Sequence, residues 1–544
     1  MNSQVVFRSS MHNTRIPFFL LRFLHVLLFV GFAIYTIAFL THSFEVVTYP
    51  WSVDYVEAPE LNRAVRIAQG REIYPSWDNP PFVESNYTPF FSMINALIID
   101  ATQPTYWQGR LFNVMLTLVT AGLVARIVFI QTTTVWQAIL GAMLYCSSHI
   151  IWMWSSLLRV DTLAVFLNML ALWLFLEPNW KKNKFQMSIV ALLCLGAAFT
   201  RQTMIASFLS ISVVTVWKHR QLSTHLFTVY LIGGVLGVLW LSMWSGGYAF
   251  THLIKANINE FSWSNVLFFF GTMWDLYHAL IPAIIIGIWM VWRRNPVVVL
   301  YALCAFFVSL TIGKIGASLN YLMELWIAIS IFVAIGVGHV QTLGTRGLWI
   351  ANGICLAALM GWQQSLHIPW YRSPKPNGGF TAKSTEAWET CMIWVSQLPI
   401  AHLDPFGLHG ADLRAQSVRV FSSYRGDWER NAMNNIEHNL PSFPGSILSE
   451  DMNFTVTSGR EIWIQPFEFT QFSNQGLWSD APLLDAIVQQ KFSLLILLFD
   501  INVDVSQTPS GDRFSPQVRA AMKKRYTLVS REGLYWIYTP KVTP

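Results

Sequence analysis

The segment YPWSVDYVEAPELNRAVRIAQGREIYPSWDNPPFVESNYT, residues 49–88, is a polar stretch that follows the first long apolar run of the chain. It opens with three carboxylates, Asp54, Glu57 and Glu60, within seven residues. Acidic side chains directly beside a hydrocarbon-length helix are costly unless they have a partner or a function. We therefore interpret this loop as an acidic centre around which a set of membrane helices is arranged.

The composition is that of a polytopic membrane protein. Of the 544 residues, 53% are apolar and only 12% are charged, whereas about a quarter of the residues are charged in soluble domains. The apolar run 17–40 is too long for a signal-peptide core and lacks a small-residue cleavage site, so it is predicted to be a retained first helix. The basic residues form no continuous stripe, which argues against nucleic-acid binding.

Taking about twenty apolar residues per crossing, the sequence predicts eleven transmembrane helices. They lie near 17–40, 108–130, 134–151, 161–177, 185–200, 203–217, 225–245, 266–292, 297–312, 321–340 and 347–366. Basic loop residues favour the cytoplasmic side, and these share the side of the N-terminus: Lys181, Lys182, Lys184, Lys218, Arg220, Arg293, Arg294 and Arg346. A cytoplasmic N-terminus and eleven crossings put the first loop, 41–107, and everything after 366 on the extracytoplasmic side.

Two short helices are expected inside the first loop. Residues 59–70 start with proline, end with glycine and have apolar residues at helical spacing, which predicts an amphipathic helix on the membrane surface. Residues 89–100 are apolar but too few to span, so we expect an interfacial or re-entrant segment.

The chain after residue 366 has the composition of a globular α/β domain. Helices are predicted at 381–397, 482–490 and 516–525, strands at 446–450 and 492–499, and a closing hairpin at 526–538. The fold of 400–442 is left open. The predicted organisation is thus a transmembrane domain, 1–366, and an extracytoplasmic α/β domain, 367–544.

The acids suggest a group transfer that needs a general base. Asp54 is the predicted base, and Glu57 either orients the acceptor or replaces Asp54. The alternative is that both merely solvate a surface loop.

Several charged residues contradict the positive-inside pattern, because they map to the outer halves of the predicted helices. These are Arg110, Arg159 with Asp161, Arg201 in FTRQT, and Lys314 in GKIGASLNY. Charges at that depth usually face a protein interior or a water-filled cavity, and basic groups there can bind a lipid phosphate. For any single residue, interfacial snorkelling or a structural pair such as Arg159 with Asp161 is the alternative.

Three further residues are candidates for substrate binding. Tyr87 follows the acidic loop, and Tyr321 and Glu324 begin the predicted tenth crossing. Interfacial tyrosines are often simple membrane anchors. Glu324, one turn into an apolar helix, is expected to pair with Lys314 or Arg201.

Other chemistries lack sequence support. The chain has no Walker loop, GxSxG elbow, HExxH or paired CxxC motif. The histidines have no metal-ligand spacing and no disulfide framework is implied. No cofactor is predicted. A divalent ion held by Asp54 and Glu57 is possible but not indicated.

The segments VDYVEAPELNRAVRIAQGREIYP, SNYTPFF, GRLFNVMLTL, LLRVDTLAVFLNMLAL and FTRQT, in this order, resemble the GT-C superfamily of integral membrane glycosyltransferases. The closest likeness is to the branch of dolichyl-phosphate-mannose protein mannosyltransferases and the lipid A aminoarabinose transferase. The resemblance covers 17 to about 366, and the tail fits the C-terminal domain of many members.

This resemblance implies a polyprenyl-phosphate sugar donor and a glycan, lipid or protein acceptor at the outer face of the cytoplasmic membrane. The catalytic acid of the first outer loop would be Asp54, with Glu57 as the second acid of a DxxE pattern. Many relatives have adjacent acids there, so which of the two is the base stays open. A transporter or flippase of a lipid-linked saccharide, and a non-catalytic assembly factor, are the alternatives.

Overall fold

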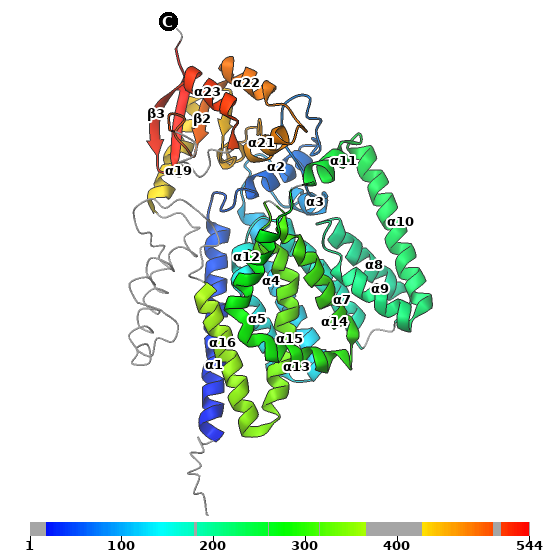
Figure 1. The fold of residues 1–544 in the computed structure, drawn as a ribbon. Helices are drawn as coiled ribbons and strands as arrows, with labels where there is room; N and C mark the ends of the chain where they lie inside the picture. Colours follow the sequence, from blue (N-terminus) through cyan, green and yellow to red (C-terminus); the bar gives the residue numbers. More distant parts are fainter. Residues whose placement is uncertain are drawn as a thin grey trace, which may run out of the picture.

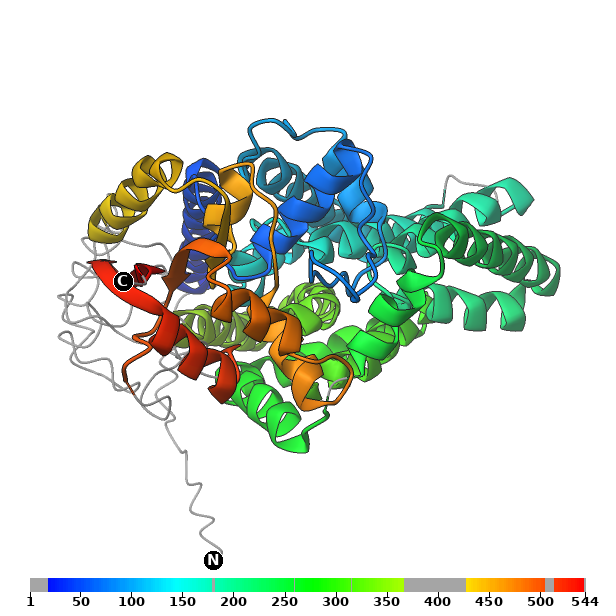
Figure 2. The same ribbon diagram turned by 90° about the horizontal axis from the view of Figure 1, so that it is seen from above.

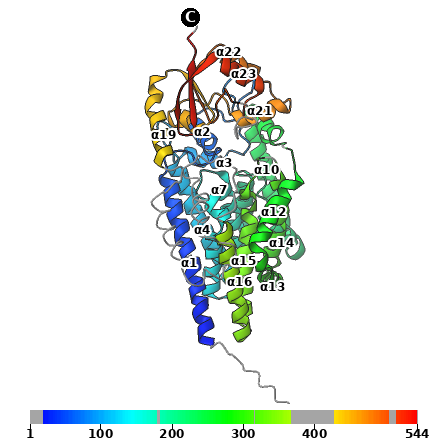
Figure 3. The same ribbon diagram turned by 60° about the vertical axis from the view of Figure 1, so that its left-hand side comes forward.

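The computed structural model describes residues 18–178, 182–258, 260–314, 316–365, 427–503 and 513–542. It has an elongated body of helices with a sheet-containing C-terminal unit at one end (Figures 1 and 3). Seen from above, the C-terminal elements cover one part of the body and leave the side of α8, α9 and α10 uncovered (Figure 2). The helix predicted at 381–397 and most of 400–442 lie outside the described residues.

Sixteen α-helices, counted over the described part of 18–365, make up the body. They are α1 (Phe18–Thr48), α2 (Glu57–Ala68), α3 (Phe90–Ala96), α4 (Trp107–Thr132), α5 (Val135–Cys146), α6 (His149–Trp154), α7 (Val160–Leu176), α8 (Lys184–Ala198), α9 (Ala206–Lys218), α10 (Arg220–Trp244), α11 (Tyr248–Leu253), α12 (Trp263–Tyr277), α13 (Ile281–Trp292), α14 (Pro296–Ser309), α15 (Met323–Gln341) and α16 (Gly344–Ser365).

The predicted number of eleven crossings is not confirmed. In the described residues, six segments are long and apolar enough to cross a membrane: Phe19–Thr48, Trp107–Thr132, Arg220–Trp244, Trp263–Trp292, Pro296–Gly313 and Leu319–Gln341. Helices α5, α7, α8 and α9 are apolar but have only 10–17 residues, fewer than the roughly twenty that a straight crossing needs.

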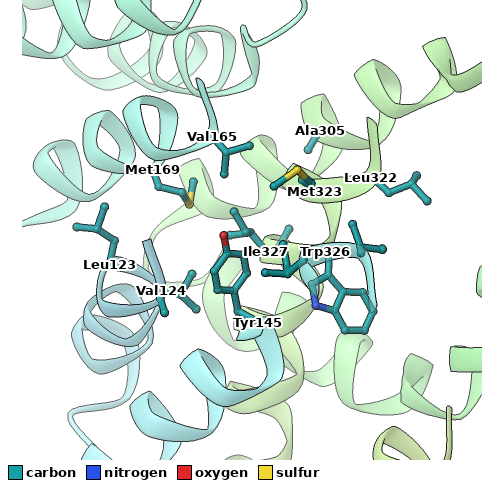
Figure 4. Packing of buried hydrophobic residues seen from close by; sticks show 14 of the residues in the cluster. Leu123, Val124, Tyr145, Val165, Met169, Ala305, Leu322, Met323, Trp326 and Ile327 are labelled. Atoms are coloured by element: carbon teal, nitrogen blue, oxygen red, sulfur yellow. The ribbon is translucent and has the colours of Figure 1, made fainter. Parts of the chain in front are cut away.

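Helix α15 is the centre of the body. In its apolar span, 83% of the residues are buried. Trp326 and Met323 of α15 pack with Tyr145 of α5, Val124 of α4 and Met169 of α7 (Figure 4). The indole of Trp326 donates a hydrogen bond to the carbonyl of Leu144 at 3.2 Å, so the buried N–H is satisfied.

The predicted amphipathic helix in the first loop is confirmed as α2, but its expected position on the membrane surface is wrong. Every residue from Glu57 to Arg66 is buried. The helix lies between the body and the C-terminal unit (Figure 1), contacting α3 and α20 (Asn453–Thr457). Its polar residues therefore face other protein groups instead of lipid headgroups.

The C-terminal unit contains a four-stranded mixed sheet in the order β1-β2-β4-β3. The strands β1 (Ser446–Ser449) and β2 (Phe492–Leu497) are parallel, and β4 (Tyr535–Pro540) pairs antiparallel with β2 and with β3 (Tyr526–Glu532). Both predicted strands and the closing hairpin are confirmed. The helices of the unit are α19 (Asp427–Asn439), α20, α21 (Pro466–Asn474), α22 (Ala481–Val488) and α23 (Pro516–Arg525).

The first loop and the C-terminal unit are joined through backbone and side-chain contacts. Phe82 forms a parallel bridge with Ile464, and its N–H donates to the carbonyl of Trp463 at 2.8 Å. The amide N–H of Ser52 donates to the Asn453 side chain at 3.0 Å. The two polar segments are thus one layer at the end of the helical body.

Candidate functional site

Asp54 lies in the turn between α1 and α2, where its carboxylate faces the start of α7. Its Oδ2 accepts a hydrogen bond from Arg159 Nη1 at 2.6 Å and one from the backbone N–H of Val56 at 3.3 Å. The Asp54 side chain is 14% exposed, more than the Arg159 side chain at 8%. Asp54 is therefore the more exposed member of this ion pair.

Arg159 links Asp54 to a second, fully buried acid. Its Nε donates to Asp161 Oδ2 at 3.3 Å, and its guanidinium stacks 4.7 Å from the centre of the Trp154 ring. Asp161 has no exposed side-chain surface and also accepts from Arg201 and, at 2.9 Å, from Asn320 Nδ2. We call the series Asp54, Arg159, Asp161 and Arg201 the acid–arginine chain.

Two tyrosines flank the far end of the acid–arginine chain. The guanidinium of Arg201 lies 4.1 Å from the centre of the Tyr321 ring, a cation–π distance. Burial raises the pKa of the Tyr87 hydroxyl, and the nearby Arg201 guanidinium opposes that shift. Among the residues described, the buried Nη2 of Arg201 has no hydrogen-bond partner. The guanidinium is held between the Asp161 carboxylate and Tyr321.

Glu57, the other predicted catalytic acid, is fully buried, and both of its carboxylate oxygens accept hydrogen bonds. Its carboxylate accepts from Arg110 Nε at 2.8 Å and Nη2 at 2.7 Å, and from the N–H groups of Leu158 and Val53, both at 2.7 Å. Burial alone raises the pKa of Glu57, but the Arg110 guanidinium and the hydrogen bonds from the N–H groups of Leu158 and Val53 together outweigh it, so the pKa lies below its ordinary value. A buried carboxylate with these partners is a poor proton acceptor.

Arg110, predicted to bind a phosphate, uses its donors inside the protein instead. Besides Glu57, it donates to the carbonyls of Val46, Tyr49 and Trp51 at 2.6 to 2.9 Å, and it has no exposed surface. Because five N–H groups are all a guanidinium has, none remains for a ligand. Through these hydrogen bonds, Arg110 of α4 and Glu57 connect the end of α1 with α4 and with the turn before α7.

In the described residues, Glu324 forms an ion pair with neither of its predicted partners, Lys314 and Arg201. Glu324 Oε1 accepts from Asn168 Nδ2 at 2.8 Å and from the Tyr301 hydroxyl at 3.2 Å. Lys314 Nζ donates to the carbonyl of Asn257 at 2.7 Å. Within the described ranges, no hydrogen bond or ion pair joins either residue to the acid–arginine chain.

A second group of charged residues, not predicted from the sequence, lies where α2 meets the C-terminal unit. Arg63 donates to Glu60 at 2.7 Å, and Tyr55 donates to Glu468 at 2.9 Å. Burial raises the pKa of Glu84 well above its ordinary value, and Arg63 only partly opposes this. In the residues described, no three His, Cys, Asp or Glu side chains are grouped to hold a metal ion.

His252 of α11, for which no role was predicted, forms hydrogen bonds with residues of the first loop. Its Nδ1 accepts from the Ser85 N–H at 3.1 Å, and its Nε2 lies 2.9 Å from the carbonyl of Pro75. The ring must be neutral to accept at one nitrogen and donate at the other. Burial lowers the pKa of His252 to about 4, so this requirement is met at neutral pH.

Fold and site together define a multi-pass helical membrane protein with a buried acid–arginine chain beneath a sheet-containing C-terminal unit. A similar solved structure is that of ArnT from Cupriavidus metallidurans in the apo state, at TM-score 0.63 and 12% identity, covering 93% of this chain and 97% of that one. The same protein bound to undecaprenyl phosphate matches at TM-score 0.62 and 13% identity, with the same coverage. At these identities the comparison shows a shared fold over nearly the full length of both proteins.

The oligosaccharyltransferase AglB of Archaeoglobus fulgidus, in complex with an inhibitory peptide and a dolichol-phosphate, also matches. It has a TM-score of 0.43 and 11% identity, over 94% of this chain and 74% of its own. No protein-family model and no curated protein sequence matches the chain.

Proposed function

We propose that this protein is a membrane glycosyltransferase that moves a sugar from a polyprenyl-phosphate donor to an acceptor hydroxyl or amine. The observation that carries the proposal is the acid–arginine chain, in which a partly exposed carboxylate, Asp54, is 2.6 Å from a guanidinium. This arrangement offers a proton acceptor beside groups that attract a phosphate.

In the proposed reaction, Asp54 takes the proton of the acceptor as its oxygen or nitrogen bonds to the anomeric carbon. The bond between that carbon and the phosphate oxygen breaks, and its electron pair leaves with the polyprenyl phosphate. A single displacement of this kind inverts the configuration at the anomeric carbon. Arg201, with its buried unpartnered Nη2, and Arg159 stabilise the charge that develops on the phosphate.

The other predicted site residues have different proposed parts. Glu57 and Arg110 are positioning residues, because their hydrogen bonds fix the backbone of Trp51 and Val53, directly before Asp54. Tyr87 and Tyr321 flank the phosphate end next to Arg201. We assign no part in the transfer to Glu324 or Lys314.

The fold similarity supports the proposed donor class. ArnT shares the fold over 93% of this chain and has been seen with undecaprenyl phosphate, a lipid of the class proposed here. The similar structures give no support to the transporter alternative. We propose the cytoplasmic membrane as the location, with Asp54 and the C-terminal unit on its outer face, since the basic loops map to the opposite end of the helices.

The test is Asp54→Asn, which removes the base and keeps the size of the side chain. The variant is expected to insert and fold like the wild type but to lose at least 100-fold in transfer. Purified protein is incubated with labelled polyprenyl-phosphate sugars, and the release of polyprenyl phosphate is measured. Asp78→Asn, an exposed acid of the same loop, is the matched control. Wild-type turnover by Asp54→Asn would remove Asp54 from the mechanism.

A further inference from the structure

The C-terminal unit contacts the first loop on both sides of Asp54. Before it, the backbone N–H of Ser52 donates to Asn453 Oδ1 at 3.0 Å. After it, the hydroxyl of Tyr55 donates to Glu468 Oε2 at 2.9 Å. Neither contact belongs to the acid–arginine chain, so the segment that carries the proposed base has a second set of partners.

The Tyr55 hydroxyl acts both as a donor and as an acceptor. Besides donating to Glu468, it accepts the backbone N–H of Phe467 at 3.3 Å. Both partners lie in the first turn of α21, where backbone N–H groups have no acceptor within the helix. The hydroxyl supplies one of these acceptors, and the two hydrogen bonds hold the end of the Tyr55 side chain at this turn.

The ring of Tyr55 packs against Arg513, also in the C-terminal unit. The guanidinium lies 4.7 Å from the ring centre, which is within cation–π range. Arg513 is itself held, because its Nη1 lies 3.4 Å from Glu450 Oε1 and its carbonyl accepts from Thr470 Oγ1 at 2.8 Å. Both the ring and the hydroxyl of Tyr55 are therefore in contact with the C-terminal unit.

The helical body holds the two residues between these contacts. The N–H of Val53 donates to Glu57 Oε2 at 2.7 Å, and the Asp54 carboxylate accepts from Arg159 Nη1 at 2.6 Å. Asp54 and Tyr55 share one planar peptide unit. If the Tyr55 side chain were released, rotation of this unit would move the Asp54 carboxylate relative to Arg159.

We propose that the C-terminal unit positions the base of the transfer through Tyr55, which acts on Asp54 without touching the substrate. This role rests on the proposed function, in which Asp54 takes the acceptor proton. A general base has to lie within hydrogen-bond reach of that proton. A misplacement of about 1 Å can lower a rate about a hundredfold, so a restraint on the neighbouring residue affects catalysis directly.

The experiment compares Tyr55→Phe with the wild type in the full chain, purified in detergent. The variant keeps the ring beside Arg513 and loses the hydroxyl bonds to α21. We expect kcat for the release of polyprenyl phosphate to fall about tenfold, with an unchanged KM for the labelled polyprenyl-phosphate sugar. Without substrate, amide hydrogen exchange is expected to be faster than in the wild type in a peptide containing residues 52–56.

Tyr538→Phe is the matched control. The Tyr538 hydroxyl also donates to an acid, Asp500, at 2.9 Å and accepts a backbone N–H, that of Ile501, at 3.1 Å, but all three residues lie within the C-terminal unit. The control is expected to lower the thermal unfolding midpoint about as much as Tyr55→Phe while keeping the wild-type kcat and the wild-type exchange of 52–56. Equal losses of kcat in the two variants would overturn the proposal, because they would indicate a general loss of stability.

Changes at Glu468 test whether the effect passes through one hydrogen bond. Glu468→Gln keeps an acceptor for the Tyr55 hydroxyl and is expected to keep nearly the wild-type kcat, whereas Glu468→Leu is expected to lose as much as Tyr55→Phe. Combining Tyr55→Phe with Glu468→Leu should add no further loss, since both changes remove the same bond. Losses that add in full would overturn the proposed route.

The outcomes separate this proposal from the proposed function. Wild-type kcat and exchange in Tyr55→Phe would overturn the positioning role, while a loss of transfer in Asp54→Asn would still support the transferase. A raised KM with an unchanged kcat would also overturn it, because Tyr55 would then contact the substrate. If the wild type releases no polyprenyl phosphate, the proposed function fails, and the exchange of 52–56 still decides whether Tyr55 holds the Asp54 segment.

Discussion

Arg110 and Arg159 both reach the segment around Asp54, but their surroundings differ. Arg110 is enclosed by backbone carbonyls and Glu57 and has no exposed surface. The Arg159 side chain is 8% exposed and bridges two acids, one of which is open to solvent at 14%. Sequence position alone cannot separate them, since each arginine stands at the start of an apolar helix.

Replacing Arg110 by alanine is expected to reduce stability far more than the loss of an ordinary contact. The change leaves Glu57 charged and buried and frees three carbonyls, for an expected loss of about 3 to 5 kcal/mol. Thermal unfolding in detergent measures it. Arg126→Ala is the control, because the Arg126 side chain is 38% exposed in its pair with Glu177, and exposed pairs contribute about 1 kcal/mol or less. If both variants lost the same amount of stability, the proposed structural role of Arg110 would be contradicted.

Among the elements, α4 is in close contact with α3 and with the turn before α7 at Gly109. A Cβ added at Gly109 would lie 2.1 Å from Leu158 Cδ1 and 2.5 Å from Asn95 Oδ1. Both atoms are ends of side chains, so the absence of a side chain at 109 makes room for Asn95 and for Leu158, which directly precedes Arg159. We therefore expect the absence of a side chain at Gly109 to help position Arg159.

Gly109→Ala is therefore expected to displace the 157–159 turn and lower the rate of transfer at least tenfold. Gly122→Ala, in the same helix, is the matched control, since a Cβ there meets nothing within 4 Å. The control should keep full activity and gain up to about 1 kcal/mol of stability from the lower backbone entropy of alanine. The rate of polyprenyl-phosphate release and the unfolding midpoint of both variants are measured. Equal activity of the two would show that the close approach at Gly109 is dispensable.

The lengths of the apolar segments predicted most helices well, but they did not predict where a helix is interrupted. The predicted helix 134–151 is two helices, α5 and α6, because Ser148 accepts the Ile150 N–H and starts a new helix. The predicted helix 266–292 is interrupted by a 3-10 turn at His278–Leu280. For the site, the sequence identified Asp54, Arg159, Asp161 and Arg201, which are in contact. It could not find Asn320 or Glu468, because neither is a charged residue in an apolar helix or in the first loop, and only the fold brings them to Asp161 and Tyr55.

At the scale of the whole molecule, the C-terminal unit covers the charged face of α2. Glu84 is 3% exposed there, and burial raises its pKa, opposed by Arg63 and Lys314. A carboxyl whose pKa is raised on folding contributes stability that is complete below its ordinary value of 4.5 and is lost as the pH rises through the raised value.

Glu84→Gln, which stays neutral at every pH, should therefore unfold at the same temperature as the wild type near pH 4.5 and at a higher temperature under alkaline conditions. Unfolding midpoints from pH 4.5 to 9 measure the difference. Glu72→Gln, an exposed acid of the same loop, is expected to follow the wild type throughout. A constant offset between Glu84→Gln and the wild type would rule out titration of Glu84 as the cause.

The four members of the acid–arginine chain consist of two anions and two cations, so at rest the quartet is electroneutral. If Asp54 gains a proton during transfer, the quartet acquires one surplus positive charge. In the same step, the departing lipid changes from a phosphodiester monoanion to a phosphate monoester dianion. The added charges are opposite and arise together, so the total charge of this poorly hydrated region is constant and no counterion has to enter from solution.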